Sequence, residues 1–436
     1  MTTIFNKIWF LIKVTFIILS ESCIYFVFKN KDKFVANITD KLAGVNILYV
    51  KIFQAVALNN KLIDEKTNNY LLKYTDNAPY KNEDIDYNTL HKLIADENLH
   101  GETELIPINS GMISLVFKFL KKETNEEIVI KIKRNNIDQI LEEAVDNLLF
   151  FVYLLSYISI IQQYEIPKTV SKNIEIVRNQ TDFIQEIENM RIIKNNCKRL
   201  NYIEIPAVYK NITEKYKNVI MMQFIKGEKI ENLPSEDFYD FSILLHKFVF
   251  ITLFVNGVTH GDMHSGNILF INNDNNKKIG IIDFGILYKT NKSFNDSIFD
   301  FCTEIFTKPS REVAIKVLKN GFFEPHNIVD KISKDDYEIL INLISVFIDD
   351  ILHKSKEANQ VKIYEFLFHL NKYVQEKKLD VYGIRMSDEF IKLQMFLAMY
   401  QGIILKLTGD DYMITANKVI NELYGSMLTI LNPLDN

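Results

Sequence analysis

Cysteine is scarce in this sequence, and its spacing excludes two classes of small protein. The 436 residues contain three cysteines, Cys23, Cys197 and Cys302. An odd number of widely separated cysteines fits neither a disulfide framework nor a zinc knuckle, so we expect the bulk of the chain to lie in a reducing, intracellular compartment. We expect each cysteine to be a small buried apolar residue rather than a nucleophile.

Blocks of basic residues are also lacking. Lysine and arginine number 51 against 56 aspartates and glutamates, and the net charge is −5. Because there is no basic arm or patch, we expect no nucleic-acid partner. There is no internal repeat and no long low-complexity tract, and the 47% of apolar residues fits a globular protein long enough for two or three domains.

One long apolar run is present, from Ile8 to Phe28. As a helix it would extend about 31 Å, which is close to the thickness of a bilayer core. Lys13 and Glu21 interrupt it, and two central charges nearly cancel the free energy gained by inserting the apolar residues. Three interpretations stay open: a membrane helix that lies in the interface or inserts marginally, which we favour, a core helix packed on the domain, and a cleaved signal peptide, which the missing A-x-A site disfavours.

Hydrophobic periodicity gives a coarse map of the rest of the chain. Pro79 and a polar cluster break the first helical region. The predicted elements are helices over 30–75, strands with a polar turn over 105–133, helices over 137–163 and 182–195, a two-stranded hairpin over 203–227, and mostly helices after 235.

Five polar residues occur in an order that indicates phosphoryl transfer. Lys131 lies in the apolar strand "IVIKIK", and Glu186 lies on a later predicted helix. Asp262 and Asn267 are five residues apart in "HGDMHSGNILF", and Asp283 begins "DFG" after another apolar strand. Such a reaction needs a cation on the phosphates, a carboxylate that holds this cation, metal ligands, and a residue that orients the nucleophile.

The same order occurs in protein kinases, as a strand lysine, H-R-D-x-x-x-x-N and D-F-G. The interval from Asp262 to Asn267 matches that signature. No A-P-E follows Asp283, which argues against an ordinary activation segment with a platform for peptides.

Several motifs are similar to those of the ABC1/UbiB atypical kinase family. "HGDMHSGNILF" resembles the family's H-A-D-P-H-P-G-N-I-L loop, and "IVIKIKRNNI" resembles V-A-V-K-V-Q-R-P-G-I. "QTDFIQEIEN" resembles E-L-D-x-x-x-E-A-x-N, with Gln180 in place of the first acid, and "VIMMQFIKG" resembles the family hinge. "PINSGMISLVF" takes the place of an alanine-rich loop, and "KIFQ", residues 51–54, that of K-x-G-Q, with Phe53 for glycine. In that family the K-x-G-Q segment folds over the site and blocks protein substrates. Phe53 and Gln180 depart from the family pattern, so the same blocking is in doubt here.

The resemblance implies an α+β, bilobal, protein-kinase-like fold with a small β-rich N-lobe, a helical C-lobe and an added N-terminal helical extension. It also implies four parts. These are a hydrophobic helix over 1–30, the helical extension with the K-x-G-Q-like segment over 31–100, the N-lobe over 101–225, and the C-lobe over 226–436.

The resemblance also implies roles for the five polar residues, with ATP and Mg²⁺ as cofactors. Lys131 would hold the α- and β-phosphates and pair with Glu186. Asp262 would orient the nucleophile or accept its proton. Asn267 and Asp283 would ligate Mg²⁺, although a structural hydrogen bond is the alternative for Asn267.

Further contacts to ATP are expected from two segments. Met222, Gln223 and Phe224 would lie near the adenine. Converging backbone amides would cover the phosphates; they belong to Ser110, Gly111, Met112, Ile113 and Ser114. In the catalytic loop we expect His260 to brace the backbone, while His264 either braces the loop or makes a contact particular to the family.

Three functions follow. The leading hypothesis is an ATP-binding, Mg²⁺-dependent kinase-like phosphotransferase or ATPase, which the resemblance links to membrane lipid or isoprenoid-quinone metabolism. Its partners would be a membrane lipid or lipid-like molecule, with a protein substrate as another acceptor, and the N-terminal segment would associate it with a membrane inside the cell. The alternatives are a Ser/Thr protein kinase and a non-catalytic, nucleotide-gated membrane scaffold.

Overall fold

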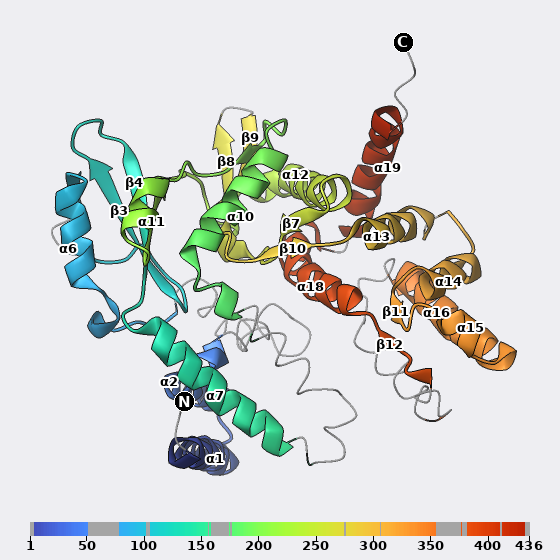
Figure 1. Cartoon of the computed structure of the whole chain (residues 1–436), viewed down its shortest axis with the longest axis horizontal. Coiled ribbons are helices and arrows are strands. Elements are labelled where there is room, and N and C mark those ends of the chain that lie inside the picture. The colour runs from blue at the N-terminus through green and yellow to red at the C-terminus, as the bar shows by residue number, and fades with distance from the viewer. Residues whose placement is uncertain are drawn as a thin grey trace. The chain divides into compact units, whose positions relative to one another are not determined.

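The computed structural model (Figure 1) divides into two compact units, which are described separately. Unit 1 comprises Met1–Arg191, Ile205–Lys226 and Ile281–Ile286, and unit 2 comprises Ile192–Glu204, Gly227–Gly280 and Leu287–Asn436. The structure describes residues 4–50, 78–101, 105–155, 157, 174, 177–273, 276–305, 307–354, 376, 382–409 and 412–431.

The centre of unit 1 is a five-stranded antiparallel sheet in the order β1-β3-β4-β6, with β2 added beside β3. The strands predicted between residues 105 and 133 and their polar turn are confirmed. The strands are β1 (Leu99–His100), β2 (Asn109–Ser110), β3 (Ser114–Lys121), β4 (Glu127–Lys133) and β6 (Val219–Gln223). The helices of unit 1 are α1 (Ile4–Phe28), α2 (Lys31–Val45), α6 (Tyr87–Asp96), α7 (Ile137–Leu155), α11 (Lys210–Lys215) and the first turns of α10 (Phe183–Asn196), with a short 3₁₀ turn, η1 (Asn82–Asp84).

Alternation along the strands separates the apolar core of this sheet from the candidate site. Phe117 of β3 lies opposite Ile130 of β4, and both are fully buried with Leu90 and Leu93 of α6 in one apolar cluster. Successive side chains of a strand point to opposite faces, so Lys131 points to the other face of the sheet.

The predicted hairpin over 203–227 is partly correct, because Val208 pairs antiparallel with Met222 through an isolated bridge. Its first part splits into β5 (Ile203–Glu204), which pairs in parallel with β9 (Asn276–Ile281) in unit 2, and the short helix α11. Only the second part forms the predicted strand, β6, which pairs with β4. The sequence Lys-Asn-Ile-Thr-Glu-Lys of α11 forms a short helix with Ile212 buried and charged residues outward, and this helix interrupts the β pattern.

The N-terminal helical extension packs within unit 1. α1 lies beside α2 and α7 (Figure 1), and Phe10 and Val14 of α1 join an apolar cluster with Leu141 and Val145 of α7. Leu11 and Ile17 pack partly buried against this cluster, whereas most of the other large apolar side chains of α1 are exposed. Those that are exposed are Ile4, Phe5, Ile8, Trp9, Ile12, Phe16, Ile18, Leu19, Ile24, Tyr25, Phe26, Val27 and Phe28.

Glu21 of α1 is an acidic residue whose side chain is almost fully buried. It accepts hydrogen bonds from Lys41 (2.5 Å) and Asn37 (3.2 Å) of α2, and the hydrogen bond from Lys41 lowers the pKa of Glu21. α1 therefore has the packed side expected of a core helix and the exposed apolar side expected of an interfacial one. Cys23 is exposed, so the expectation that it is buried is wrong; Cys197 is buried and Cys302 partly so.

Helices dominate unit 2. α12 (Phe238–Phe250), α18 (Asp388–Thr408) and α19 (Tyr412–Leu431) pack together. The other helices are α13 (Lys292–Glu304), α14 (Ser310–Lys319), α15 (Ile328–Lys331) and α16 (Lys334–Lys354), and the strands are β5, β7 (Val258–His260), β8 (Ile268–Asn273), β9, β10 (Leu287–Lys289), β11 (Phe323–Glu324) and β12 (Arg385–Met386).

Within the part of the chain that the structure describes, two helical stretches are long and apolar enough to cross a membrane, Ile4–Phe28 and Ser235–Val255. The second is 56% buried within the protein, as for a core helix, whereas only 17% of the first is buried. Length and composition alone are weak grounds for a span, since core helices and signal sequences meet the same criteria.

The predicted architecture is confirmed: a small β-rich part, a helical part, and a helical extension at the N-terminus. The division at residues 30, 100 and 225 stays a prediction. The K-x-G-Q-like residues 51–54 lie outside the described residues.

Replacing Phe117 with alanine should lower the free energy of unfolding of unit 1 by about 3–5 kcal/mol, because the ring is fully buried and its loss leaves a cavity. Chemical denaturation followed by circular dichroism measures this change. Ile108→Ala, at a side chain that is 52% exposed, is the control and should change stability by less than about 0.5 kcal/mol. Equal effects of the two substitutions would contradict the placement of Phe117 in the core.

Candidate functional site

Lys131 lies at the centre of the sheet, where β4 pairs with strands on both sides. Its partners in register are Val116 on β3 and Ile220 on β6. Two flanking strands restrict the backbone, and Ile130 and Ile132 anchor it in the core on the opposite face. The sheet therefore holds the Lys131 ammonium in a defined place. Only 9% of the Lys131 side chain is exposed.

Two carboxylates from distant parts of the sequence meet this ammonium. Lys131 Nζ lies 2.6 Å from Glu186 Oε1 and 2.7 Å from Asp283 Oδ2. All three residues belong to unit 1 and come from β4, from α10 and from the segment after β9. Glu186 is fully buried, whereas 30% of the Asp283 side chain is exposed. The structure thus brings together three of the five residues predicted from motif order.

Burial and charge act in opposite directions on these groups. Burial is the largest influence on Glu186 and raises its pKa, the Lys131 ammonium lowers it, and the negative charge of Asp283 raises it; the net pKa is about 7. Burial by itself would lower the pKa of Lys131, but the two carboxylates more than offset this and raise it. Oε2 of Glu186 is buried without a hydrogen-bond partner among the described residues. The cluster therefore combines one firmly held cation with two carboxylates, one of which reaches solvent.

Helix α10 also holds the Asp-Phe-Gly segment. Asp182 caps the helix, since its carboxylate accepts hydrogen bonds from the amides of Ile184 and Gln185, both at 3.0 Å. Glu186 and Asn189 are three residues apart and so share a face of α10. The Asn189 amide donates to the Phe284 carbonyl at 2.9 Å, while the Phe284 amide lies 3.5 Å from Glu186 Oε1. One face of α10 therefore contacts both polar groups of the Phe284 backbone.

The catalytic-loop motif lies in unit 2, next to the two-stranded pairing of β7 with β10. The Asp262 amide donates to Nδ1 of His260 at 3.1 Å, so the bracing contact expected of His260 is present. The Gly266 amide donates to Nδ1 of His264 at 3.0 Å, which makes His264 a brace as well. Nε2 of His264 lies 3.8 Å from Asp262 Oδ2. A fixed backbone around Asp262 suits a residue that must orient a nucleophile.

Asn267 and Asp283 each carry an oxygen donor of the kind that Mg²⁺ prefers. The Asn267 amide nitrogen donates to the Asp262 carbonyl at 2.9 Å, which leaves its side-chain oxygen as the atom able to ligate a metal. Among the described residues, no group of three or more His, Cys, Asp or Glu side chains could hold a metal ion. Mg²⁺ bound together with ATP needs only one or two protein carboxylates, since phosphates and water supply the other ligands. Asn267 and Asp283 belong to different units, so their joint role stays a prediction.

The segments predicted to contact ATP are ordered within unit 1. In the loop Ser110–Ser114, the Gly111 amide donates to the Ser114 carbonyl at 2.9 Å. The amides of Gln223 and Phe224 donate to the carbonyls of Ala207 and Glu127. Adenine contacts from Met222, Gln223 and Phe224 and phosphate contacts from Ser110, Gly111, Met112, Ile113 and Ser114 stay predictions.

Arg134, which follows β4, has no role among the predicted site residues, although it stands in the motif "IVIKIKRNNI". Its side chain is 8% exposed and pairs with Asp84 at 2.8 Å. An arginine that directly follows an apolar strand is the only signal in the sequence, and it does not tell a buried side chain from a solvated one.

Gln180 lies beside the Asp-Phe-Gly turn, since a Cβ built on Gly285 would be 3.5 Å from Gln180 Cγ.

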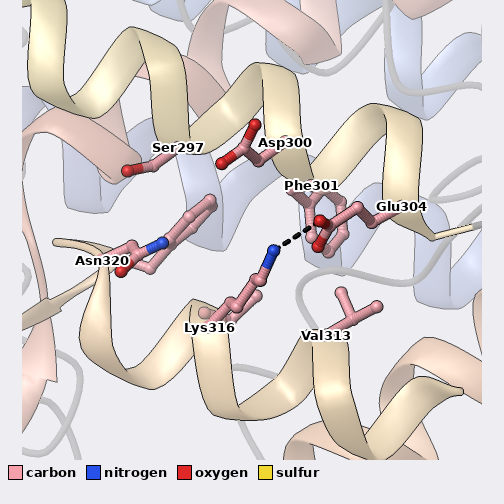
Figure 2. Close-up of a pocket in the computed structure, with 9 residues that line it drawn as sticks. Ser297, Asp300, Phe301, Glu304, Val313, Lys316 and Asn320 are labelled. Atoms are coloured by element: carbon pink, nitrogen blue, oxygen red, sulfur yellow. Dashed lines mark hydrogen bonds and ion pairs between the residues drawn. The ribbon is translucent and has the colours of Figure 1, made fainter. Parts of the chain in front are cut away.

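A hollow in unit 2 lies between α13 and α14 (Figure 2). Its volume is about 10 Å³, which is room for a single water molecule. Lys316 forms an ion pair with Glu304 across it. We assign no ligand to this hollow.

Comparison with known proteins agrees with the geometry. The family model described as "ABC1 atypical kinase-like domain" matches residues 81–321. The chain is 25% identical over 275 residues to the "Probable serine/threonine-protein kinase abkB" of Dictyostelium discoideum, a match that covers 58% of this chain and 39% of that protein. It is 24% identical over 311 residues to the "Probable protein kinase UbiB" of Blochmanniella pennsylvanica, covering 69% of this chain and 54% of the relative. These matches span about half the length of the relatives or less.

Among solved structures, that of Rv3197 with erythromycin from Mycobacterium tuberculosis has a similar fold. The TM-score is 0.50 at 15% identity, over 87% of this chain and 95% of that one. The sheet, the Lys131 cluster and the catalytic-loop motif define a protein of the kinase-like class. Because the family model matches more than half of the sequence, the chain belongs to the ABC1 atypical kinase-like family.

Replacing Lys131 with methionine should raise the pKa of Glu186 above its value of about 7, because the positive charge that stabilises the carboxylate is lost. Difference infrared spectroscopy of the protonated carboxyl band, assigned with Glu186→Gln, measures this change. The band at neutral pH should grow in Lys131→Met and stay unchanged in Lys133→Met, whose lysine pairs with the exposed Asp138. An equally ionised Glu186 in wild type and Lys131→Met would disprove the electrostatic coupling.

Proposed function

We propose that this protein is an ATP-binding, Mg²⁺-dependent phosphotransferase or ATPase of the ABC1/UbiB type. The observation that carries the proposal is the contact of Lys131 with both Glu186 and Asp283. These residues are 55 and 152 positions away from Lys131 in the sequence, and their order matches the kinase signature.

Each member of the cluster has a role under this proposal. Lys131 holds the α- and β-phosphates of ATP, and Glu186 keeps the Lys131 ammonium in place. Asp283, whose carboxylate is partly exposed, and Asn267 would hold Mg²⁺. The metal supplies charge neutralisation of the phosphates. Asp262, in its braced loop, orients the hydroxyl or water that attacks the γ-phosphorus and accepts its proton.

The acceptor that we propose is a membrane lipid, a lipid-like molecule such as an isoprenoid quinone precursor, or water. Two features support it over a protein acceptor: the missing A-P-E motif and the exposed apolar surface of α1. That surface contacts the membrane, and the protein acts inside the cell at that membrane. A Ser/Thr protein kinase is the second candidate, and the name of the Dictyostelium relative favours it.

Nucleotide turnover tests the proposal. Purified protein with Mg-ATP should release phosphate or transfer label, and Asp262→Asn should lower the rate about 10²–10⁴-fold while ATP still binds. Lys131→Met should abolish ATP binding, and Asp283→Asn should remove the part of binding that depends on Mg²⁺. Phosphate release, label transfer and calorimetric binding, each with and without liposomes, measure these effects.

Lys133→Met, on the same strand but outside the cluster, is the matched control and should retain wild-type turnover. Absence of ATP binding in every form would end the proposal. Binding without turnover, insensitive to Asp262→Asn, would instead indicate the scaffold, and label on a protein substrate would indicate the Ser/Thr kinase.

Membrane association is tested through α1. Phe16→Glu and Leu19→Glu place charges on its exposed face and should reduce flotation with anionic liposomes, since each charge opposes transfer of an apolar surface into the interface. Val346→Glu, at an equally exposed valine of α16, should float like the wild type. Unchanged flotation of both α1 variants would show that α1 does not contact the membrane.

A further inference from the structure

Arg134 is a buried cation whose partners belong to two separate segments. It lies three residues after Lys131 and its side chain is 8% exposed. The guanidinium hydrogen bonds run from Nε to Gly111 O (3.0 Å), from Nη2 to Gly111 O (2.7 Å), Ser110 Oγ (2.9 Å) and Ala78 O (3.3 Å), and from Nη1 to Pro79 O (2.9 Å) and Asp84 Oδ2 (2.8 Å).

The two segments are the loop Ser110–Ser114 and the segment Ala78–Asp84. They also bond directly, since the Ala78 amide donates to the Ser110 carbonyl and the Ser110 hydroxyl donates to the Ala78 carbonyl, both at 2.7 Å. The Arg134 amide donates to the Ile113 carbonyl at 2.9 Å. Arg134 thus contacts the loop through its backbone and its side chain.

These contacts set the direction of loop peptides. The Gly111 carbonyl accepts two hydrogen bonds from the guanidinium. Because the peptide unit is planar and trans, its N–H group, which belongs to Met112, points the opposite way. Holding the carbonyl therefore also orients an amide that we expect to face the phosphates of ATP.

The tip of the loop is held by packing as well. Met112 and Ile113 are 6% and 8% exposed and lie in the apolar cluster formed by the N-terminal extension, which includes Phe10 and Leu42. A glycine-rich loop that is free in solvent would lack such contacts. The conformation of Ser110–Ser114 is therefore tied to the extension on two sides, by apolar packing and by Arg134.

Arginine is the residue type that this position requires. Its planar fork reaches Gly111, Ser110 and the Pro79 carbonyl together, while its charge is balanced by Asp84. Lysine would bring the charge as a single point and would leave several buried carbonyls without donors.

We propose that Arg134 is a positioning residue that ties the loop Ser110–Ser114 to the segment Ala78–Asp84 and so holds it in the conformation that binds phosphates. The inference rests on the proposed function, because it takes ATP as the ligand. A loop that is ordered before the nucleotide arrives loses less conformational entropy on binding, which raises affinity. The effect should concern the phosphates and leave the nucleoside part unaffected.

Calorimetric titration of the full chain with Mg-ATP and with adenosine tests this inference. Arg134→Met should weaken ATP binding about tenfold, which corresponds to the loss of one hydrogen bond between a loop amide and the charged phosphates. Adenosine binding should stay within about twofold of the wild type. Arg134→Lys should give an intermediate loss. Arg178→Met is the matched control, since Arg178 pairs with Glu142 at the surface, and it should bind both ligands as the wild type does.

Hydrogen exchange supplies a readout that does not depend on nucleotide. Amides 110–114 should exchange faster in Arg134→Met than in Arg178→Met. If Arg134→Met does not fold, Asp84→Asn replaces it, because it weakens the same tie from the other segment; ATP binding should then fall about threefold with adenosine unchanged.

Three results would overturn the inference. The first is an equal loss of ATP and adenosine affinity, which indicates a purely structural role. The second is an unchanged ATP affinity in the folded Arg134→Met variant. The third is an unchanged exchange rate of the loop amides 110–114. Failure of the proposed function is distinguishable, since the wild type itself would then bind no ATP.

Discussion

The burial of one ammonium group governs the arrangement of unit 1. Lys131 is nearly excluded from water, and an isolated ammonium in that position would be strongly unfavourable. Glu186 and Asp283 compensate it, which requires that β4, α10 and the segment after β9 all be in place. With two carboxylates against one lysine, the cluster is well suited to receive a further cation.

Unit 1 contains a second buried cation, and the protein stabilises it differently. Lys131 pairs with two carboxylates, whereas Arg134 has a single carboxylate and otherwise binds neutral oxygens of the backbone and of Ser110. The first arrangement leaves negative charge that a ligand can use. In the second, the guanidinium donors form hydrogen bonds within the protein. Two cations three residues apart thus have different surroundings, two carboxylates for Lys131 and mainly neutral oxygens for Arg134.

The N-terminal extension connects the membrane proposal to the candidate site. α1 exposes apolar side chains on one side, while Phe10 and Val14 pack into the same cluster that receives Met112 and Ile113. Glu21, buried against Lys41, holds α1 to α2. A helix held in this way keeps its apolar side exposed while remaining part of unit 1.

Motif order and periodicity predicted the strands around Lys131, helix α10 and the five polar residues, because these signals are local. Contacts between distant segments are not encoded locally, so the pairing of Lys131 with Glu186 and Asp283 could be expected only by resemblance. The predicted hairpin was only partly correct because the apolar run at 203–208 does not show its pairing partners, which are β9 for β5 and Met222 for Val208. The role of Arg134 was hidden for the same reason: Gly111 and Ala78, its partners, lie 23 and 56 residues away, and only the folded chain brings their carbonyls to one guanidinium.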